Sequence, residues 1–116
     1  MSAMKPRGET DLSWSNLSDV CRELVKAIGT MEREDRVPTG AALAEEVRLH
    51  ATADISDPTV YRHLKTLQRL DIVSTTCVDD RAKRHDLSDR GQSILQEEAL
   101  DICYAADLCV DDGRAD

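Results

Sequence analysis

Residues 56–73 read SDPTVYRHLKTLQRLDIV and carry the signals of a helix start followed by an amphipathic helix. Ser56 or Asp57 can cap free backbone N–H groups, and Pro58 suits the first helical position, where its missing N–H costs nothing. At about 100° per residue, four apolar side chains share one face: Val60, Leu64, Leu67 and Leu70. The stretch therefore predicts a helix over residues 57–70 with one face in a core.

The opposite face of this helix is cationic and rich in hydrogen-bonding groups. No acidic residue lies between Thr59 and Leu70. The side chains on this face are those of Thr59, Arg62, Lys65, Thr66 and Arg69. Solvated basic faces are common on amphipathic helices, so this face alone is as compatible with plain solvation as with nucleic-acid binding.

A run rich in β-branched residues follows the helix directly. Residues 72–78 are predicted as a strand, residues 79–82 as a turn and residues 83–87 as a short return strand. A basic-faced helix followed by a hairpin is the plan of a winged helix-turn-helix. The segments TVYRHLKTLQRLDIV (residues 59–73) and RHDLSDRG (residues 84–91) resemble the recognition helix, wing and wing exit of MarR, PadR and ArsR-type transcriptional regulators. The likeness covers roughly residues 17–95.

This resemblance implies a mainly α fold with a small β-hairpin. The specific fold that it implies is a winged helix-turn-helix with a long C-terminal helix. It also implies a sequence-specific DNA-binding regulator with helix 57–70 in the major groove and wing 78–86 on the backbone or minor groove. Arg62 is expected to read guanine with its planar fork. The expected DNA contacts are Ser56, Thr59, Tyr61, Arg62, Lys65, Thr66, Arg69, Arg81, Lys83 and Arg84.

Within this set, the first turns of the helix and its later turns have different expected roles. Thr59, Tyr61 and Arg62 are expected to contact bases, whereas Lys65 and Arg69 are expected to bind phosphates. In the wing, three cations should meet the backbone or the adjacent minor groove, opposed by two aspartates. The cations are Arg81, Lys83 and Arg84, and the aspartates are Asp79 and Asp80.

Two scaffold helices are expected before residue 56. The first starts at Trp14 or after a Ser15 cap and ends near Gly29, with apolar residues at helical spacing: Leu17, Val20, Cys21, Leu24, Val25 and Ile28. Thr39 caps the second. Its expected buried side is Ala42, Leu43, Val47 and Leu49, and its expected outward side is Glu45, Glu46 and Arg48.

After the wing, Ser88 is placed to cap a last helix over residues 88–110. One apolar stripe holds Leu95, Ile102, Ala106 and Cys109, and a second holds Leu100, Tyr104 and Leu108. A domain of this size can cover only one stripe, so the second predicts a homodimer interface. The alternative is that both sides pack on the first helix. The predicted organisation is a flexible tail (1–12), one winged-helix domain (13–110) and a flexible acidic tail (111–116).

The charge balance is acidic, with 23 acidic and 15 basic residues and a net charge of -8. Residues 56–90 are nonetheless nearly balanced, with seven basic and six acidic residues, whereas residues 91–116 hold one and seven. Aspartate outnumbers glutamate, arginine outnumbers lysine and phenylalanine is absent, a bias that resembles halophilic archaeal proteins. No apolar run is long enough to span a membrane, so the expected location is the cytoplasm.

No catalytic motif is present, since the sequence lacks a phosphate-binding glycine loop, a nucleophile elbow and a His-Glu-x-x-His pair. We therefore expect no enzyme activity, no cofactor and no metal. Cys103 and Cys109 lie about 240° apart on a helix and cannot share one ion within it. Two alternatives stay open: a winged-helix module that binds protein in a transcription or replication complex, and a metal- or thiol-sensing regulator. A small-molecule or redox effector has no support in the sequence.

Overall fold

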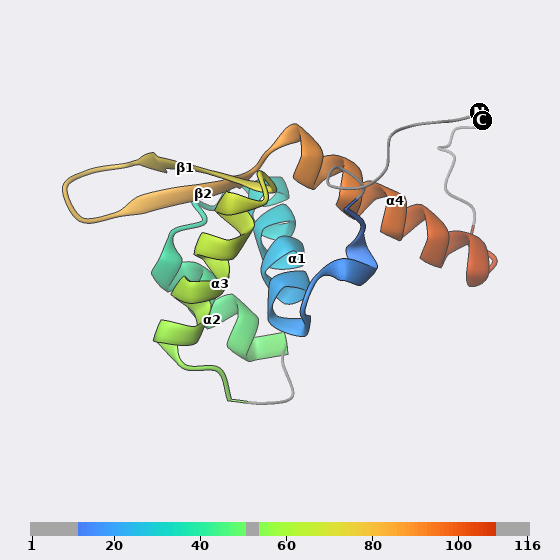
Figure 1. Cartoon of the computed structure of the whole chain (residues 1–116), viewed down its shortest axis with the longest axis horizontal. Coiled ribbons are helices and arrows are strands. Elements are labelled where there is room, and N and C mark those ends of the chain that lie inside the picture. The colour runs from blue at the N-terminus through green and yellow to red at the C-terminus, as the bar shows by residue number, and fades with distance from the viewer. Residues whose placement is uncertain (1–11, 51–53, 109–116) are drawn as a thin grey trace.

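The computed structural model describes residues 12–50 and 54–108 (Figure 1). The element order is η2 (Trp14–Asn16, a 3-10 helix), α1 (Asp19–Arg33), α2 (Gly40–His50), α3 (Asp57–Arg69), β1 (Val73–Cys77), β2 (Lys83–Leu87) and α4 (Asp89–Ala105). The predicted mainly helical fold with one hairpin is confirmed. Both predictions for the central stretch are also confirmed, because α3 begins after a Ser56 cap and the hairpin follows it directly.

The core lies between α1, α2 and α3. All three helices contact one another, and α1 runs through the middle of the molecule (Figure 1). The apolar face predicted for α3 is buried at three of its four positions, with Leu70 half-buried at the end of the helix. Fully buried core side chains include Leu24, Val25, Ile28, Leu43, Val47, Val60, Leu64, Leu67 and Ile72. Burial of these side chains holds the exposed face of α3 in a fixed orientation.

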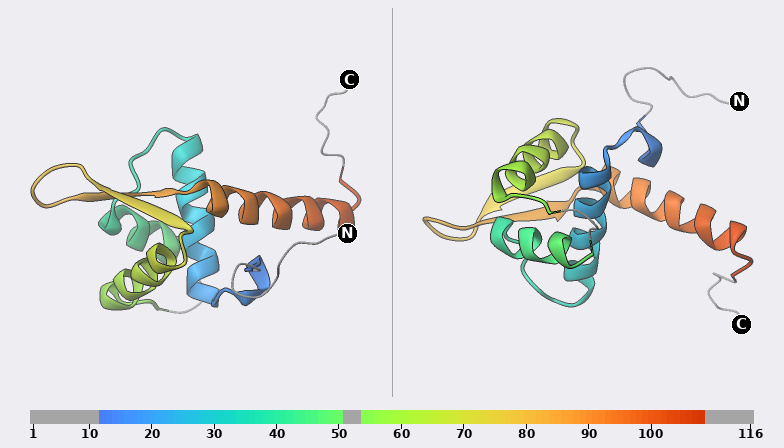
Figure 2. Two further views of the ribbon diagram at one scale, coloured as in Figure 1. Left: turned by 45° about the horizontal axis from the view of Figure 1, so that its top comes forward. Right: turned by 90° about the horizontal axis from the view of Figure 1, so that it is seen from below.

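The hairpin is an antiparallel pair whose register runs from Val73↔Leu87 at the base to Cys77↔Lys83 near the tip. Thr39, the residue that precedes α2, forms an isolated antiparallel bridge with Arg84. It therefore pairs with the side of β2 that faces away from β1. The outer half of the hairpin and the C-terminal half of α4 extend from the helical body in opposite directions (Figures 1 and 2).

Ser88 joins the hairpin to α4 through a compact set of hydrogen bonds. Its hydroxyl accepts from the Gly91 N–H (3.0 Å) and donates its one proton to the nearer carbonyl oxygen, that of Asp71 (2.6 Å), while the Ile72 carbonyl oxygen lies 3.0 Å away. Its backbone N–H also donates to the Ile72 carbonyl (2.9 Å). The first turn of α4 is thereby held against the end of the α3–β1 connection, and Gly91 lies directly against the Ile72 backbone.

Only the first half of α4 packs on the body. Gly91 and Ile94 are buried and Leu95 is half-buried, whereas the later leucine, isoleucine and tyrosine residues are exposed and Cys103 is half-buried. The exposed fractions are 55% for Leu100, 56% for Ile102, 88% for Tyr104 and 61% for Leu108. The expectation that the stripe through Ile102 is covered by the domain is therefore wrong, because the C-terminal half of α4 extends away from α1 (Figure 2).

Several predicted boundaries and positions need correction. The first helix begins at Asp19, because the Ser18 hydroxyl accepts from the Cys21 N–H (3.2 Å), and it continues through Gly29 to Arg33. The last helix ends at Ala105 rather than at residue 110, since residues 106–108 leave the helix and Asp107 has a φ of 62°. Residues 109 and 110 lie outside the described residues.

The second helix also differs in what it buries. Leu49, expected in the core, is 77% exposed, whereas Glu46, expected to face outward, is 9% exposed. The Glu46 carboxylate accepts a hydrogen bond from Arg36 (3.3 Å) and lies 3.3 Å from His50 Nε2, so partners offset its burial. Leu12, predicted as part of the N-terminal tail, packs against the core, and the rest of both predicted tails lies outside the described residues.

Candidate nucleic-acid interface

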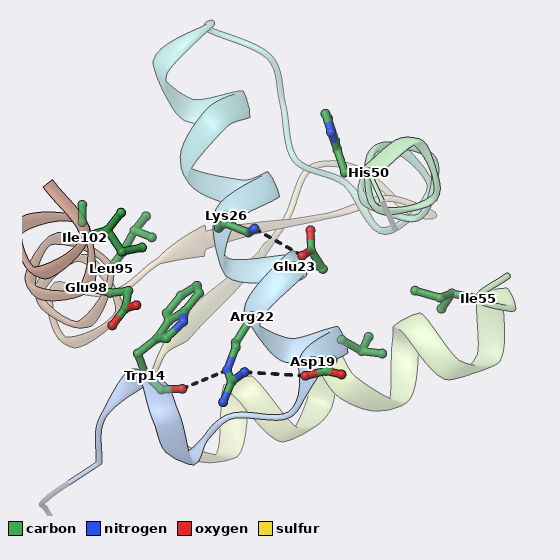
Figure 3. A pocket seen from close by; sticks show the side chains of 12 residues that line it. Trp14, Asp19, Arg22, Glu23, Lys26, His50, Ile55, Leu95, Glu98 and Ile102 are labelled. Carbon is green, nitrogen blue, oxygen red and sulfur yellow. Dashed lines mark hydrogen bonds and ion pairs between the residues drawn. The ribbon is translucent and has the colours of Figure 1, made fainter. Parts of the chain in front are cut away.

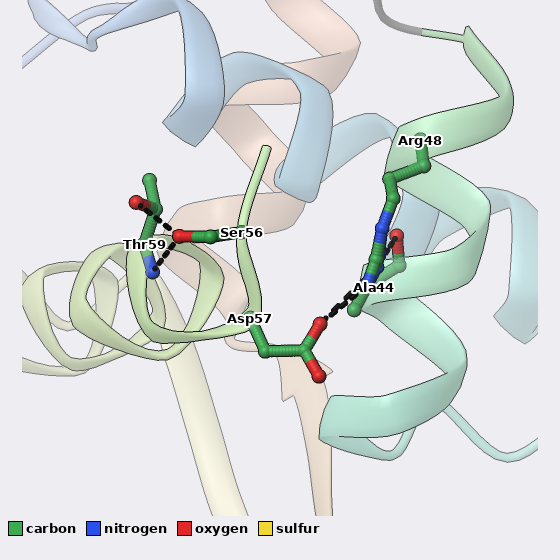
Figure 4. Close-up of polar contacts among 5 residues, drawn as sticks. All are labelled: Ala44, Arg48, Ser56, Asp57 and Thr59. Carbon is green, nitrogen blue, oxygen red and sulfur yellow. Dashed lines mark hydrogen bonds and ion pairs between the residues drawn. The ribbon is translucent and has the colours of Figure 1, made fainter. Parts of the chain in front are cut away.

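The N-terminus of α3 is fixed by the hydroxyls of Ser56 and Thr59 (Figure 4). The Ser56 hydroxyl accepts from the Thr59 N–H (3.3 Å) and lies 2.9 Å from Thr59 Oγ1. Ser56 is exposed and Thr59 is half-buried. Both hydroxyls therefore lie at the start of α3 with their positions set by each other, and each keeps capacity for a further hydrogen bond.

An ion pair crosses the turn between α2 and α3. The Arg48 guanidinium from α2 contacts the Asp57 carboxylate and also donates to the Ala44 carbonyl (3.4 Å; Figure 4). Asp57 suits the positive end of the α3 dipole, but a bare carboxylate there would repel a DNA phosphate. Arg48 offsets that charge. The sequence pattern placed Arg48 only on an outward face, because a contact between two helices leaves no local signal.

The exposed face of α3 carries three cations, Arg62, Lys65 and Arg69, as the sequence predicted. Within residues 12–50 and 54–108, none of the three forms an ion pair with an acidic side chain. The half-buried Thr66 hydroxyl donates to the Arg62 carbonyl (3.3 Å) and accepts from Arg69 Nη2 (3.3 Å). This face thus presents uncompensated positive charge to solvent.

Tyr61 lies at the edge of this face and packs against the start of α2. Its ring lies so close to Gly40 that a Cβ at that position would be 2.3 Å from the ring carbon Cε1. The side chain is still 44% exposed. Gly40 therefore allows Tyr61 to lie over the N-terminus of α2 while one side of its ring stays accessible.

The three wing cations are in different surroundings. Arg81 and Lys83 are exposed near the tip, whereas half-buried Arg84 donates to Asp86 at 2.8 and 3.0 Å. Asp79, predicted to oppose these cations, accepts from the backbone N–H groups of Arg81 and Ala82 (both 2.8 Å). These bonds lower the pKa of Asp79, so its charge helps to form the turn.

A groove lies away from these cations, between η2, α1 and α4 (Figure 3). Its volume is about 680 Å³, and its apolar lining includes Trp14, Val20, Leu95, Ala99 and Ile102. Arg22 fixes one wall by donating to the carbonyl oxygens of Trp14 and Ser15 (both 3.2 Å). Ile102 lies at the edge of this groove and is 56% exposed, so the groove reaches the exposed part of α4.

The described part of the chain offers few side chains that could bind a metal ion together. No group of three or more His, Cys, Asp or Glu side chains there could hold an ion. Cys21, Cys77 and Cys103 are free thiols, and Cys109 lies outside the described residues. Among the same residues, no helix has the length and apolar character needed to cross a membrane.

Comparison with solved structures supports the winged-helix fold. RosR of H. salinarum aligns with a TM-score of 0.68 and 15% identity, covering 84% of this chain and 82% of that chain. A PadR family transcription regulator from Clostridium difficile R20291 aligns with a TM-score of 0.62 and 15% identity, covering 78% and 93%. ZitR of Lactococcus lactis, a zinc-responsive MarR family member, aligns with a TM-score of 0.58 and 20% identity, covering 82% and 58%.

These identities are low, so the likeness concerns the fold, for which the predicted resemblance to PadR and MarR-type regulators is confirmed. No curated protein matches the chain by sequence. The sequence profile of the ferric uptake regulator family matches residues 20–97, which is more than half of the chain and includes α1, α2, α3, the wing and the first half of α4. The chain therefore belongs to the ferric uptake regulator family, and it is a winged-helix, DNA-binding transcriptional regulator and not an enzyme.

Proposed function

We propose that this regulator reads a specific DNA sequence by placing α3 in a major groove and the wing on the adjacent backbone or minor groove. The observation that carries the proposal is the face of Arg62, Lys65 and Arg69, three exposed cations without an ion pair in the described residues of a chain with net charge -8. Such a face matches a polyanion, and α-helices fit the major groove.

Roles within this interface follow from position and packing. Thr59, Tyr61 and Arg62 lie in the first turns of α3 and are proposed to contact base edges, with Ser56 beside them. Lys65 and Arg69 are proposed to bind phosphates, and Thr66 to orient Arg69. In the wing, Arg81 and Lys83 are the stronger candidates for backbone contact, because the Arg84 guanidinium is already paired with Asp86.

Arg62→Ala tests the distinction between reading bases and holding the backbone. It should cost about 1–3 kcal/mol on the cognate duplex and relax its sequence preference, whereas Lys83→Ala should weaken all duplexes about equally. Binding titrations on cognate and scrambled duplexes measure both effects. Arg33→Ala removes an exposed cation outside α3 and the wing and is the control. Equal, negligible losses for Arg62→Ala and Lys83→Ala would move the DNA site elsewhere.

We further infer that the regulator is a homodimer joined through Leu100, Tyr104 and Leu108. The support is the exposure of these residues on a helix whose C-terminal half extends from the body. Exposed apolar side chains that share one face of a helix are typical of an interface. A second copy is the proposed occupant because a twofold pair of α4 helices would cover the same stripe on both chains. The alternative of packing both sides of α4 on α1 has no support.

Metal sensing, protein binding and effector binding are less well supported than DNA binding. The family name implies iron, yet the described residues offer no donor set that fits a metal, so no step is assigned to one. No observation favours a protein-binding module over DNA binding or supports a small-molecule or redox effector. We propose that the described residues form one winged-helix domain and that the regulator acts in the cytoplasm.

The salt dependence of DNA affinity tests how a chain with a net negative charge can bind a polyanion. When the logarithm of DNA affinity is plotted against the logarithm of salt concentration, each phosphate contact normally adds about -0.9 to the slope, because counterions are released on binding. Here the net charge of -8 also opposes the approach of DNA, and salt screens that repulsion. We therefore expect a shallow or positive slope, with a rising thermal midpoint, across about 0.1–2 M KCl. A steep fall in affinity without a gain in thermal midpoint would contradict this expectation and the halophilic interpretation.

A further inference from the structure

A hydrogen-bond chain joins the last turn of α3 to the middle of the wing. Gln68 Nε2 donates to Thr75 Oγ1 on β1, and Thr75 Oγ1 lies 2.9 Å from His85 Nδ1 on β2. Thr75 and His85 are a directly paired set in the hairpin register. Three side chains from three successive elements therefore meet at one point between the helix and the hairpin.

This point lies at the boundary between the anchored and the projecting parts of the wing. The basal pair, Val73 and Leu87, is in the core, whereas Cys77 and Lys83 near the tip are exposed. His85 lies between them and is only 6% exposed. Its backbone N–H also donates to the Pro38 carbonyl (2.9 Å), which ties the same residue to the segment before α2.

The buried imidazole has no acidic side chain as a hydrogen-bond partner in the described residues. Burial, followed by the charge of Lys83, lowers the pKa of His85, while Asp86 acts in the opposite direction. His85 is therefore neutral at neutral pH and acts as a hydrogen-bonding group. Lys83 lies on the same face of β2 as His85, two residues nearer the tip.

An isolated two-stranded hairpin is marginally stable, and its tip samples many orientations. Ordering such a tip when DNA binds would reduce the affinity that its cations supply, whereas a tip held in advance avoids that cost. The core holds the base of this hairpin. The Gln68–Thr75–His85 chain is the polar contact that holds its middle against α3.

We propose that Gln68, Thr75 and His85 are positioning residues that lock the wing to α3, so that Lys83 and Arg81 reach the DNA backbone while Arg62 and Lys65 occupy the groove. The inference rests on the proposed placement of α3 and the wing on DNA. It adds three residues that need not touch DNA themselves but determine whether the wing cations contribute.

Thr75→Val tests this role because valine has nearly the same shape but lacks the hydroxyl. Thr76→Val is the matched control, since Thr76 is the next residue of β1, faces the other side and makes no side-chain hydrogen bond within the described residues. We expect Thr75→Val to weaken cognate DNA about threefold to tenfold. Its salt slope should become more positive by about 0.9 for each phosphate that the wing no longer touches. Thr76→Val should change neither quantity, and Thr75→Ser should restore both.

A double-mutant cycle with Lys83→Ala separates positioning from a general loss of stability. If the chain acts through the wing cations, Lys83→Ala should cost little once Thr75→Val has released the wing, so the two losses should not add. Gln68→Met, which leaves the hairpin sequence intact, should reproduce the same non-additivity. Additive losses, or equal losses for Thr75→Val and Thr76→Val, would overturn the positioning role.

The same cycle distinguishes this inference from the proposed function. If Lys83→Ala alone weakens DNA binding while Thr75→Val and Gln68→Met do not, the wing contacts DNA and only the positioning role is wrong. If Lys83→Ala alone has no effect on affinity or salt slope, the wing contact fails and the positioning role fails with it.

Discussion

Replacing Gly91 by alanine is expected to destabilise the fold by about 2–4 kcal/mol, as an overpacked site that cannot relax. An added Cβ would lie 2.3 Å from the Ile72 carbonyl oxygen and 3.1 Å from Ile72 Cγ2. That oxygen cannot easily move, because it accepts from the Ser88 N–H (2.9 Å) and belongs to a backbone that is buried between β1 and α4. The clash should outweigh the roughly 1 kcal/mol that alanine gains in helix propensity. Thermal and denaturant unfolding measure the change.

Gly29→Ala is the matched control for this prediction. Gly29 is also a buried helical glycine, but a Cβ there would meet the flexible end of Leu95, with Cδ2 at 2.9 Å. A small rotation of Leu95 can relieve that contact, so the gain in helix propensity should leave stability nearly unchanged. Equal unfolding midpoints for Gly91→Ala and wild type would mean that α4 does not need this close approach to Ile72.

The central stretch could be predicted because its signals are local. Ser56 caps the helix within its own first turn, and the β-branched run after it has few alternatives to a strand. The sequence signals fix the start of α1 less well than that of α3, since Ser15 and Ser18 are both plausible caps. The structure uses Ser18, and Arg22 holds the preceding turn by bonding the carbonyl oxygens of Trp14 and Ser15.

The side-chain contacts that hold the candidate site together could not be predicted from the sequence, because each of them joins two separate elements. Arg48 meets Asp57 across a turn, and Gln68 meets Thr75 from helix to hairpin. Helical periodicity gives the face of a residue but not the neighbour that the face will meet. The same limit explains Glu46, whose burial depends on Arg36 from the preceding loop rather than on any pattern within α2.

The combined substitution Leu100→Glu and Tyr104→Glu is expected to give a folded monomer that has lost most of its DNA affinity. These side chains are 55% and 88% exposed in the single chain, so charging them should hardly change the stability of the monomer. At a twofold interface, however, the same carboxylates would be buried near their symmetry mates. Losing the dimer should lower affinity for a two-half-site operator by about 10²–10⁴-fold, because the second half-site would no longer bind intramolecularly.

Ser93→Glu with Gln96→Glu adds the same charge to exposed polar positions of α4 and is the control. It should leave both the dimer and most of the affinity intact, which separates loss of the interface from added repulsion of DNA. The operator should be an inverted repeat with half-sites about 10 bp apart, as a twofold dimer requires. Sedimentation and DNA titration test the pair of variants together. A wild-type chain that sediments as a monomer and binds a single half-site would contradict the interface, because exposed Leu100 and Tyr104 would then need another partner.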